Sequence, residues 1–298
     1  MKLSAPCVRR NQGLRQIQAS QIVRNVRSGI WYRDIARVYK NRATRQCLSA
    51  IVIPVILIVG ADKARGQTQG NQAVPRDADG KPDFSGIWQA VNTAAWDIQA
   101  HHAQKGVPAG MGVVEGNAIP YLPSALAKKR ANYQNRVTAD PETKCYLPGV
   151  PRLMYMPYPF QIFQTPKLVT MLFEYVHATR SIYTDGTAHP PGHIDWWMGD
   201  SRGKWEGDTL VVDSIHFNEE TWFDRAGNFH SEQLHLVERF SLLDADHINY
   251  EVTVEDPKVF SRPWRMSMIL YRHKEKDLQL LEYECYAFDN EFHPPVPQ

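Results

Sequence analysis

Hydrophobic and polar residues alternate in short runs through the second half of the chain. The clearest run covers 248–254 and reads Ile248, Asn249, Tyr250, Glu251, Val252, Thr253, Val254. Successive side chains of a β-strand point to opposite faces, so this order predicts a strand with one buried and one solvated face. Turn-forming residues at 244–246 precede the run, which indicates a hairpin with the run before it.

Runs of this kind recur along the chain with turns of two to five residues between most of them. They cover 84–91, 160–164, 168–175, 176–183, 209–217, 234–242, 248–254, 264–271 and 278–286. We therefore expect a mainly β protein of about nine or ten strands. The spacing predicts an antiparallel meander that closes into a lipocalin-like barrel or forms a strongly curved sheet. A two-sheet β-sandwich is the alternative.

Two short helices are expected ahead of most of the strands, over 94–105 and 123–137. In the second, Pro123 suits a first helical turn and alanines and leucine follow it. Its basic residues predict a solvated face; they are Lys128, Lys129, Arg130 and Arg136.

The charges of the chain are segregated, although the net charge is only +2. Residues 1–47 hold eleven basic residues and one acidic residue, which gives +10, and 48–66 add +1. Residues 67–298 therefore carry −9. An acidic domain repels phosphate backbones, so nucleic acid is not expected as a partner.

Residues 48–66 resemble a signal peptide and its cleavage region. The run 48–60 holds 13 uncharged, mostly apolar residues. A membrane-spanning helix needs about 20 such residues, whereas a signal-peptide core needs about 7–15. Ala64 and Gly66 supply small residues for cleavage after Gly66. We expect a periplasmic or extracellular protein that meets the membrane only during export; an uncleaved membrane anchor is the alternative.

The rest of the chain divides into three parts. Residues 1–47 form a basic N-terminal extension, either a misassigned translation start or a real basic arm. Residues 67–83 are polar and rich in Gly, Pro and Asp, which is typical of a flexible tether. Residues 84–298 are expected to form a single β-rich domain. Its two cysteines, Cys145 and Cys285, form either one disulfide or two buried free thiols.

Several segments resemble a large family of predicted secreted bacterial proteins, most of them uncharacterised. The segments are DFSGIW at 83–88, CYLPGVPRLMYMPY at 145–158, GDSRGKWEGDTLVVD at 199–213, FNEETWFDRAGNFHSEQLHLVER at 217–239 and VEDPKVFSRPW at 254–264. The resemblance covers nearly all of 83–288 and implies an exported β-rich domain. It brings no catalytic residues. The lipocalin-like barrel is inferred from the strand pattern alone.

The densest polar stretch, 224–239, holds the candidate catalytic residues. They are His230, Glu232, His235, Glu238 and Arg239. Strand alternation places Glu238 on one face with Leu236, where burial would raise the pKa of the carboxyl and make it a usable acid or base. Imidazole is the commonest general base. A surface strand with cross-strand ion pairs is the alternative.

Aromatic and polar residues from several segments form the candidate substrate-binding set. They are Tyr175, His177, Arg180, Trp197, Trp222 and Asp224. Aromatic rings with polar tips suit a flat, partly apolar ligand, whereas core packing is the alternative role for the rings.

A second cluster, His189, His193 and Asp195, is an alternative divalent-metal site. No HExxH helix fixes its spacing, and a loop over a cavity mouth is the more ordinary interpretation, so no metal or organic cofactor is expected. The chain also has no GxSxG, no P-loop and no GxGxxG that follows a strand and opens a helix. These absences argue against serine hydrolases, kinases and dinucleotide oxidoreductases.

Two functions of different classes remain. The first is a cofactor-independent acid–base enzyme, a lyase, hydratase, dehydratase or isomerase, that acts on a small, partly hydrophobic or aromatic molecule in a β-barrel cavity. The second is a periplasmic lipocalin-like carrier with the same cavity and no chemistry. A metal-dependent hydrolase at the His189 cluster is a further alternative. The clustering of His, Asp and Glu between 185 and 239 favours the enzyme; the substrate and the oligomeric state stay open.

Overall fold

The computed structural model describes residues 74–286. The basic extension (1–47), the signal-peptide region (48–66) and residues 67–73 of the tether lie outside the described residues. Within the described part, no helix is both long enough and apolar enough to cross a membrane.

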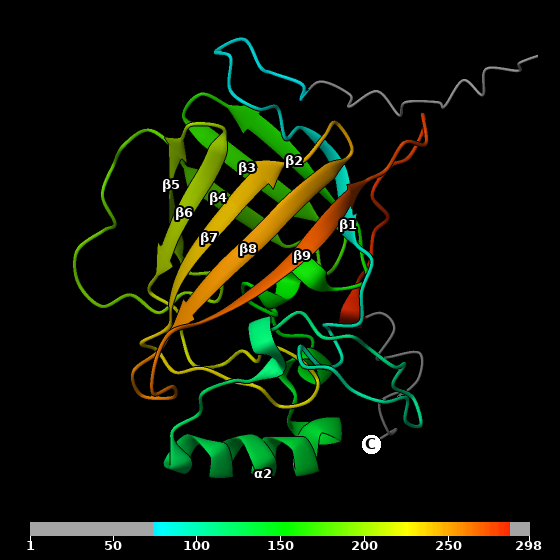
Figure 1. Cartoon of the computed structure of the whole chain (residues 1–298), viewed down its shortest axis with the longest axis vertical. Helices are drawn as coiled ribbons and strands as arrows, with labels where there is room; N and C mark the ends of the chain where they lie inside the picture. The colour runs from blue at the N-terminus through cyan, green and yellow to red at the C-terminus, as the bar shows by residue number, and fades with distance from the viewer. Residues whose placement is uncertain (1–73, 287–298) are drawn as a thin grey trace, which may run out of the picture. The chain divides into compact units, whose positions relative to one another are not determined.

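Nine strands form one closed barrel, in which each strand pairs with the next and β1 pairs with β9 (Figure 1). They are β1 Gly86–Ala90, β2 Phe160–Thr165, β3 Leu168–Phe173, β4 Thr179–Tyr183, β5 Asp200–Glu206, β6 Thr209–Ile215, β7 His235–Leu242, β8 His247–Glu255 and β9 Trp264–Arg272. The barrel expectation is confirmed, and the sandwich alternative is not what the chain adopts.

One pair of neighbouring strands departs from the antiparallel meander. Strands β4 and β5 are parallel and meet only at Ile182 with Ser201 and Tyr183 with Arg202. The connection 184–199 returns the chain to the end of the barrel where β4 began, so β5 runs in the same direction as β4. All other pairs are antiparallel, in registers such as Tyr250 with Met268.

The lumen of the barrel is filled by side chains. The alternation predicted for 248–254 is observed: Ile248, Tyr250, Val252 and Val254 are buried on the inner face. Residues of the same kind project inward from the other strands, among them Trp88, Phe160, Met171, Leu210, Leu236, Phe240 and Leu270. Side chains from strands all around the barrel therefore pack together in its lumen.

Two expected elements are wrong. Residues 94–105 form turns and isolated bridges rather than a helix, because Asp97 Oδ1 and Asp224 Oδ2 accept the N–H groups of Gln99 and Ile98. Residues 278–286 form no strand, because β9 is already paired on both sides. The run 168–183 is also interrupted at 174–178, where Val176 and His177 take left-handed φ angles of 47° and 51°.

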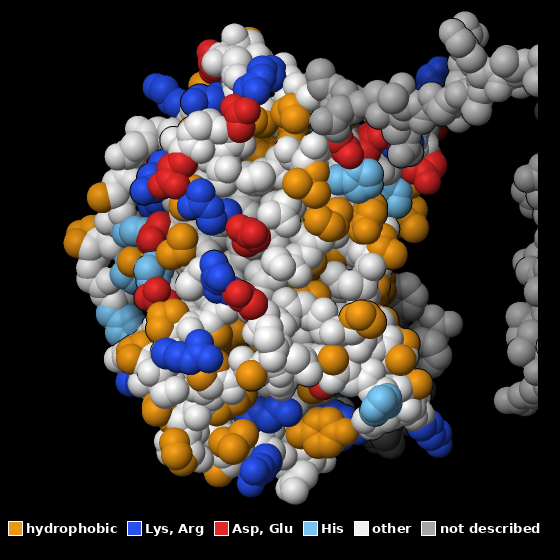
Figure 2. Space-filling view, viewed as in Figure 1, with side chains coloured by type: hydrophobic (Ala, Val, Ile, Leu, Met, Phe, Trp, Pro, Cys, Tyr) orange, Lys and Arg blue, Asp and Glu red, His pale blue; other side chains and the backbone are white. Residues whose placement is uncertain are grey.

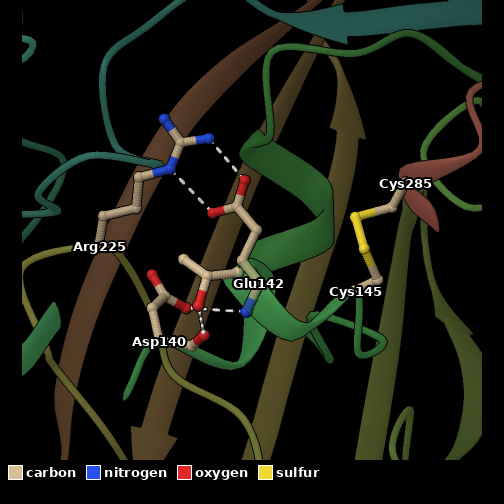
Figure 3. The surroundings of a disulfide bond; sticks show 6 residues. Asp140, Glu142, Cys145, Arg225 and Cys285 are labelled. Atoms are coloured by element: carbon tan, nitrogen blue, oxygen red, sulfur yellow. Dashed lines mark hydrogen bonds and ion pairs between the residues drawn. A yellow bond between two sulfur atoms is a disulfide. The ribbon is translucent and has the colours of Figure 1, made fainter. Parts of the chain in front are cut away.

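The second expected helix is present as α2, Pro123–Ala139, which lies beyond one end of the barrel (Figure 1). Three short 3-10 helices accompany it: η2 Glu115–Asn117, η3 Pro141–Lys144 and η4 Arg152–Tyr155. A disulfide joins Cys145, directly after η3, to Cys285 (Figure 3). The structure thus decides between the two states that the sequence left open for these cysteines.

Candidate functional site

Two predicted site residues, Arg180 and Glu238, form a buried ion pair inside the barrel. Arg180 Nη1 donates to Glu238 Oε1 at 2.9 Å, and Nη2 donates to Oε2. The Tyr250 hydroxyl also donates to Oε1, at 2.7 Å, and the hydroxyls of Ser201 and Ser214 accept from the guanidinium. The carboxylate and the guanidinium are therefore occupied by each other and by fixed hydroxyls, which is the arrangement of a packed polar core.

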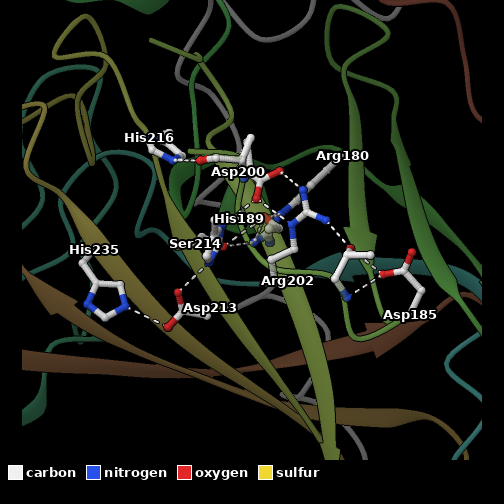
Figure 4. A network of polar contacts seen from close by, with 12 residues as sticks. Arg180, Asp185, His189, Asp200, Arg202, Asp213, Ser214, His216 and His235 are labelled. Atoms are coloured by element: carbon white, nitrogen blue, oxygen red, sulfur yellow. Dashed lines mark hydrogen bonds and ion pairs between the residues drawn. The ribbon is translucent and has the colours of Figure 1, made fainter. Parts of the chain in front are cut away.

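Another predicted residue, His235, lies outside the barrel in a chain of alternating imidazoles and carboxylates (Figure 4). His235 bonds Glu255 at 3.3 Å and Asp213 at 2.9 Å. The other oxygen of Asp213 lies 2.9 Å from His189, whose second nitrogen lies 2.6 Å from Asp200. Because the bond to Asp213 dominates, the pKa of His235 is raised. This chain ties the 184–199 connection to the outer wall.

The remaining candidate catalytic residues lie in different environments. His230 is fully buried, bonded to Thr221 at 2.6 Å and to the Ser231 carbonyl at 2.9 Å, and burial lowers its pKa. Glu232 pairs with Lys258, and Arg239 with Glu206, at the surface. The five residues are not brought to one place, because strand alternation sends Glu238 inward and His235 and Arg239 outward.

The candidate substrate-binding residues are also dispersed. Tyr175 stacks on Tyr283, His177 pairs with Glu284 at 2.7 Å, and Trp197 packs against Tyr146. Trp222 forms an isolated bridge with Phe229, and Asp224 is fully buried.

The alternative metal cluster is divided too. His189 bonds Asp200 and Asp213, whereas His193 lies 3.5 Å from Asp195. In residues 74–286, no group of three or more His, Cys, Asp or Glu side chains is arranged to hold a metal ion.

A cleft of about 370 Å³ lies outside the barrel, between α2, η3 and the segment 96–107. Its walls combine aromatic rings with charged groups of both signs. The lining residues are Trp96, Asp97, His101, Gln104, Gly106, Val107, Tyr133, Arg136, Val137, Asp140, Glu142, Thr143, Arg225 and Ala226. A few charged groups among apolar walls are typical of small-molecule sites.

A fixed ionic network forms one wall of the cleft (Figure 3). Arg152, fully buried, donates to Asp140 at 2.8 Å and to Glu142. Arg225 donates to Glu142 Oε2 at 2.8 Å, and its guanidinium lies 5.1 Å from the centre of the Trp96 ring. Burial opposes ionisation of Glu142, but the two arginines hold its pKa below the ordinary value. The network ties Asp140 and Glu142 to the two arginines.

Two carboxyl groups beside the cleft have raised pKa values. Burial raises the pKa of Asp97, which lines the cleft. Asp224 is completely buried beneath it, and burial together with the charge of Asp97 raises the pKa of Asp224 to about 7. Carboxyl groups with raised pKa values are a common feature of acid–base sites, although buried structural acids share it.

His101 adds a basic nitrogen to the same wall. Its Nδ1 lies 2.8 Å from the Gln99 carbonyl oxygen, which only accepts, so Nδ1 carries the proton of the neutral ring. Nε2 then holds a lone pair. It is buried, and no hydrogen bond to it is found among the described residues. A nitrogen of this kind can accept a proton once a bound molecule reaches it.

The chain matches no family model, no curated protein and no solved structure. The resemblance to secreted bacterial proteins therefore stays an expectation, and the role of the cleft rests on its geometry.

Sequence reasoning missed Asp97 and His101 because it placed them in a helix that does not form. A signal was present: Asn92 and Asp97 are residues that compete for backbone N–H groups, and Asn92 Oδ1 does accept from Ala94 N at 2.9 Å. Ile98 and Asp224 are 126 residues apart, so no local sequence pattern could have predicted their contact.

Proposed function

We propose that the protein is an exported acid–base enzyme that works without an organic cofactor on a small aromatic carboxylate in the cleft. The observation that carries the proposal is the unengaged Nε2 of His101 beside Asp97, whose pKa is raised. The reaction class is proton transfer at carbon, as in a lyase, dehydratase or isomerase.

Each wall of the cleft has a role in this proposal. His101 Nε2 accepts a proton from the substrate, and Asp97, whose pKa burial raises, is the second proton-transfer group. The rings of Trp96 and Tyr133 hold a flat ligand. Arg136 supplies a positive charge for a carboxylate: it donates to the Tyr133 carbonyl at 2.7 Å, and no ion pair of Arg136 with a described carboxylate is found. A charge without a counter-ion at the rim favours an anionic ligand.

A carrier protein is the second candidate, because the same rings and charges would bind a ligand without chemistry. The two functions differ in one measurable property. An enzyme exchanges the acidic C–H protons of its bound ligand with solvent, whereas a carrier does not.

Phenylpyruvate is the probe, because it combines a ring, a carboxylate and an acidic methylene group. The protein is incubated with it in D2O, and the methylene signal is followed by proton NMR. We expect faster loss of the signal than in buffer alone, with His101→Gln and Asp97→Asn each slowing the exchange by about 10²-fold or more. Native mass spectrometry of the same samples reports binding.

The matched control is the surface pair His247 and Asp244, 2.8 Å apart in the β7–β8 turn. His247→Gln and Asp244→Asn should leave the exchange rate unchanged. Binding without exchange would select the carrier. Exchange that survives His101→Gln would remove the catalytic role from the cleft.

A further inference from the structure

Residues 101–110 form a short hairpin along one side of the cleft. Two pairs of backbone hydrogen bonds hold its halves together, His101 with Gly110 and Gln104 with Val107, at distances of 2.9 and 3.0 Å in each pair. Four residues of the hairpin line the cleft: His101, Gln104, Gly106 and Val107. A movement of the hairpin would therefore change the shape of the cleft.

The hairpin is anchored firmly at its base. There the Ala100 N–H donates to Asn117 Oδ1 at 2.6 Å. Further out, within the described part of the chain, one hydrogen bond joins residues 102–110 to anything outside the hairpin. In this bond, the Tyr133 hydroxyl of α2 donates to Gln104 Oε1 at 3.4 Å, which is long for a hydrogen bond.

The hairpin also contributes little to the packed interior. None of residues 101–110 is buried, and positions 102–106, 108 and 109 are exposed. Figure 2 shows hydrophobic and basic side chains, with a histidine among them, at the surface of the end where α2 lies. A segment with few buried contacts and exposed backbone hydrogen bonds opens at a low cost in free energy.

The nitrogen proposed as the base is covered in this conformation. His101 Nε2 is buried, although the residue as a whole is partly exposed. Gly110 lies against this edge of the ring, since a β-carbon at Gly110 would be 2.5 Å from His101 Cε1 and 3.1 Å from Nε2. The same β-carbon would be 2.0 Å from Thr93 Oγ1. Nε2 thus lies where the hairpin meets Thr93, and a ligand reaches it only after the hairpin moves.

We infer that the 101–110 hairpin is a lid that opens to admit a small molecule to His101 and closes over it. The inference rests on the proposed function, because that function requires a ligand to reach Nε2. Opening breaks the bond between Tyr133 and Gln104 and leaves the bond between Ala100 and Asn117 in place. Closure of the lid excludes water from the proton transfer.

Modification of histidines by diethyl pyrocarbonate, followed by mass spectrometry, tests the lid on the full chain. The reagent attacks the ring nitrogen that holds a lone pair, which is Nε2 in His101. His102, which is exposed, is the fast reference, and His230, which is 1% exposed, is the slow reference. We expect His101 to react at least about tenfold faster than His230. A rate as low as that of His230 would overturn the inference.

Two neighbouring variants test whether the contact with α2 holds the lid closed. Gln104→Ala removes the bond to Tyr133 and should speed the modification of His101 by about twofold or more. Lys105→Ala changes the adjacent exposed position and should leave the rate unchanged. Equal rates of His101 modification in the two variants would overturn the inference.

The lid and the proposed chemistry can fail separately. Modification of His101 that speeds up in Gln104→Ala, without exchange of the phenylpyruvate methylene protons, would support the lid and overturn the enzyme. Proton exchange that depends on His101, with His101 modified as slowly as His230, would support the enzyme and overturn the lid.

Discussion

Arg180 of β4 and Glu238 of β7 form a two-pronged ion pair across the lumen of the barrel, with both side chains almost completely buried. The residues are 58 positions apart in the chain. Because both groups are shielded from solvent, the loss of one leaves the other buried without its partner.

Removing one partner of this pair should destabilise the protein strongly. Arg180→Met or Glu238→Gln leaves a polar group without its partner in the core, and each should lower the free energy of unfolding by about 3–5 kcal/mol. Arg180→Met with Glu238→Leu should recover part of the loss. Urea unfolding measures all three. The surface pair Arg239 and Glu206, 3.0 Å apart, is the control, and Arg239→Met should cost less than about 1 kcal/mol. Equal losses of unfolding free energy at the buried and the surface pair would contradict the prediction that burial makes the Arg180–Glu238 pair costly to break.

The disulfide between Cys145 and Cys285 should contribute substantially to stability. It closes a loop with a sequence separation of 140 residues, which restricts the unfolded chain. Replacing both cysteines with serine should lower the free energy of unfolding by about 3–5 kcal/mol. The comparison is Cys7→Ser with Cys47→Ser, at positions outside the described residues. A double variant at 145 and 285 that unfolds at the wild-type urea concentration would show that the bond adds no stability.

Asp224 should make stability fall as the pH rises. Its pKa is raised from 3.8 to about 7 in the folded protein, so the folded state keeps a proton that the unfolded state has lost between these values. Each unit of pH increase within that window should therefore lower the free energy of unfolding by about 1.4 kcal/mol. Asp97→Asn removes the neighbouring charge and should flatten the dependence, whereas Asp79→Asn at the surface should not. Urea unfolding at several pH values from 4 to 7 checks the slope.

His235 should also make stability fall as the pH rises, but in a higher pH range. Its bond to Asp213 raises its pKa above 6.5, so this contribution to stability is complete below 6.5 and is lost as the pH rises through the raised value. NMR titration of the His235 ring should give a lower pKa in Asp213→Asn than in the wild-type protein. An unchanged His235 titration would exclude control by Asp213.

The strand pattern allowed the barrel to be predicted, and the reasons are local. Alternation along 248–254 reports which residues face the core, because successive side chains of a strand point to opposite faces. The inward position of Glu238 and the outward position of His235 follow from the same rule. The 278–286 run failed as a strand because pairing depends on a free edge, and β9 has none.

The candidate site could not be predicted, because its members are distant in the chain. Arg225 reaches Glu142 across 83 positions, and Asp224 accepts from Ile98 across 126. Local order determined the barrel, the α2 helix and the acidic charge of residues 67–298. Only the tertiary structure decided that Asp97 and His101 line a cleft beside that helix, since burial and the meeting of remote charges arise when the whole chain packs.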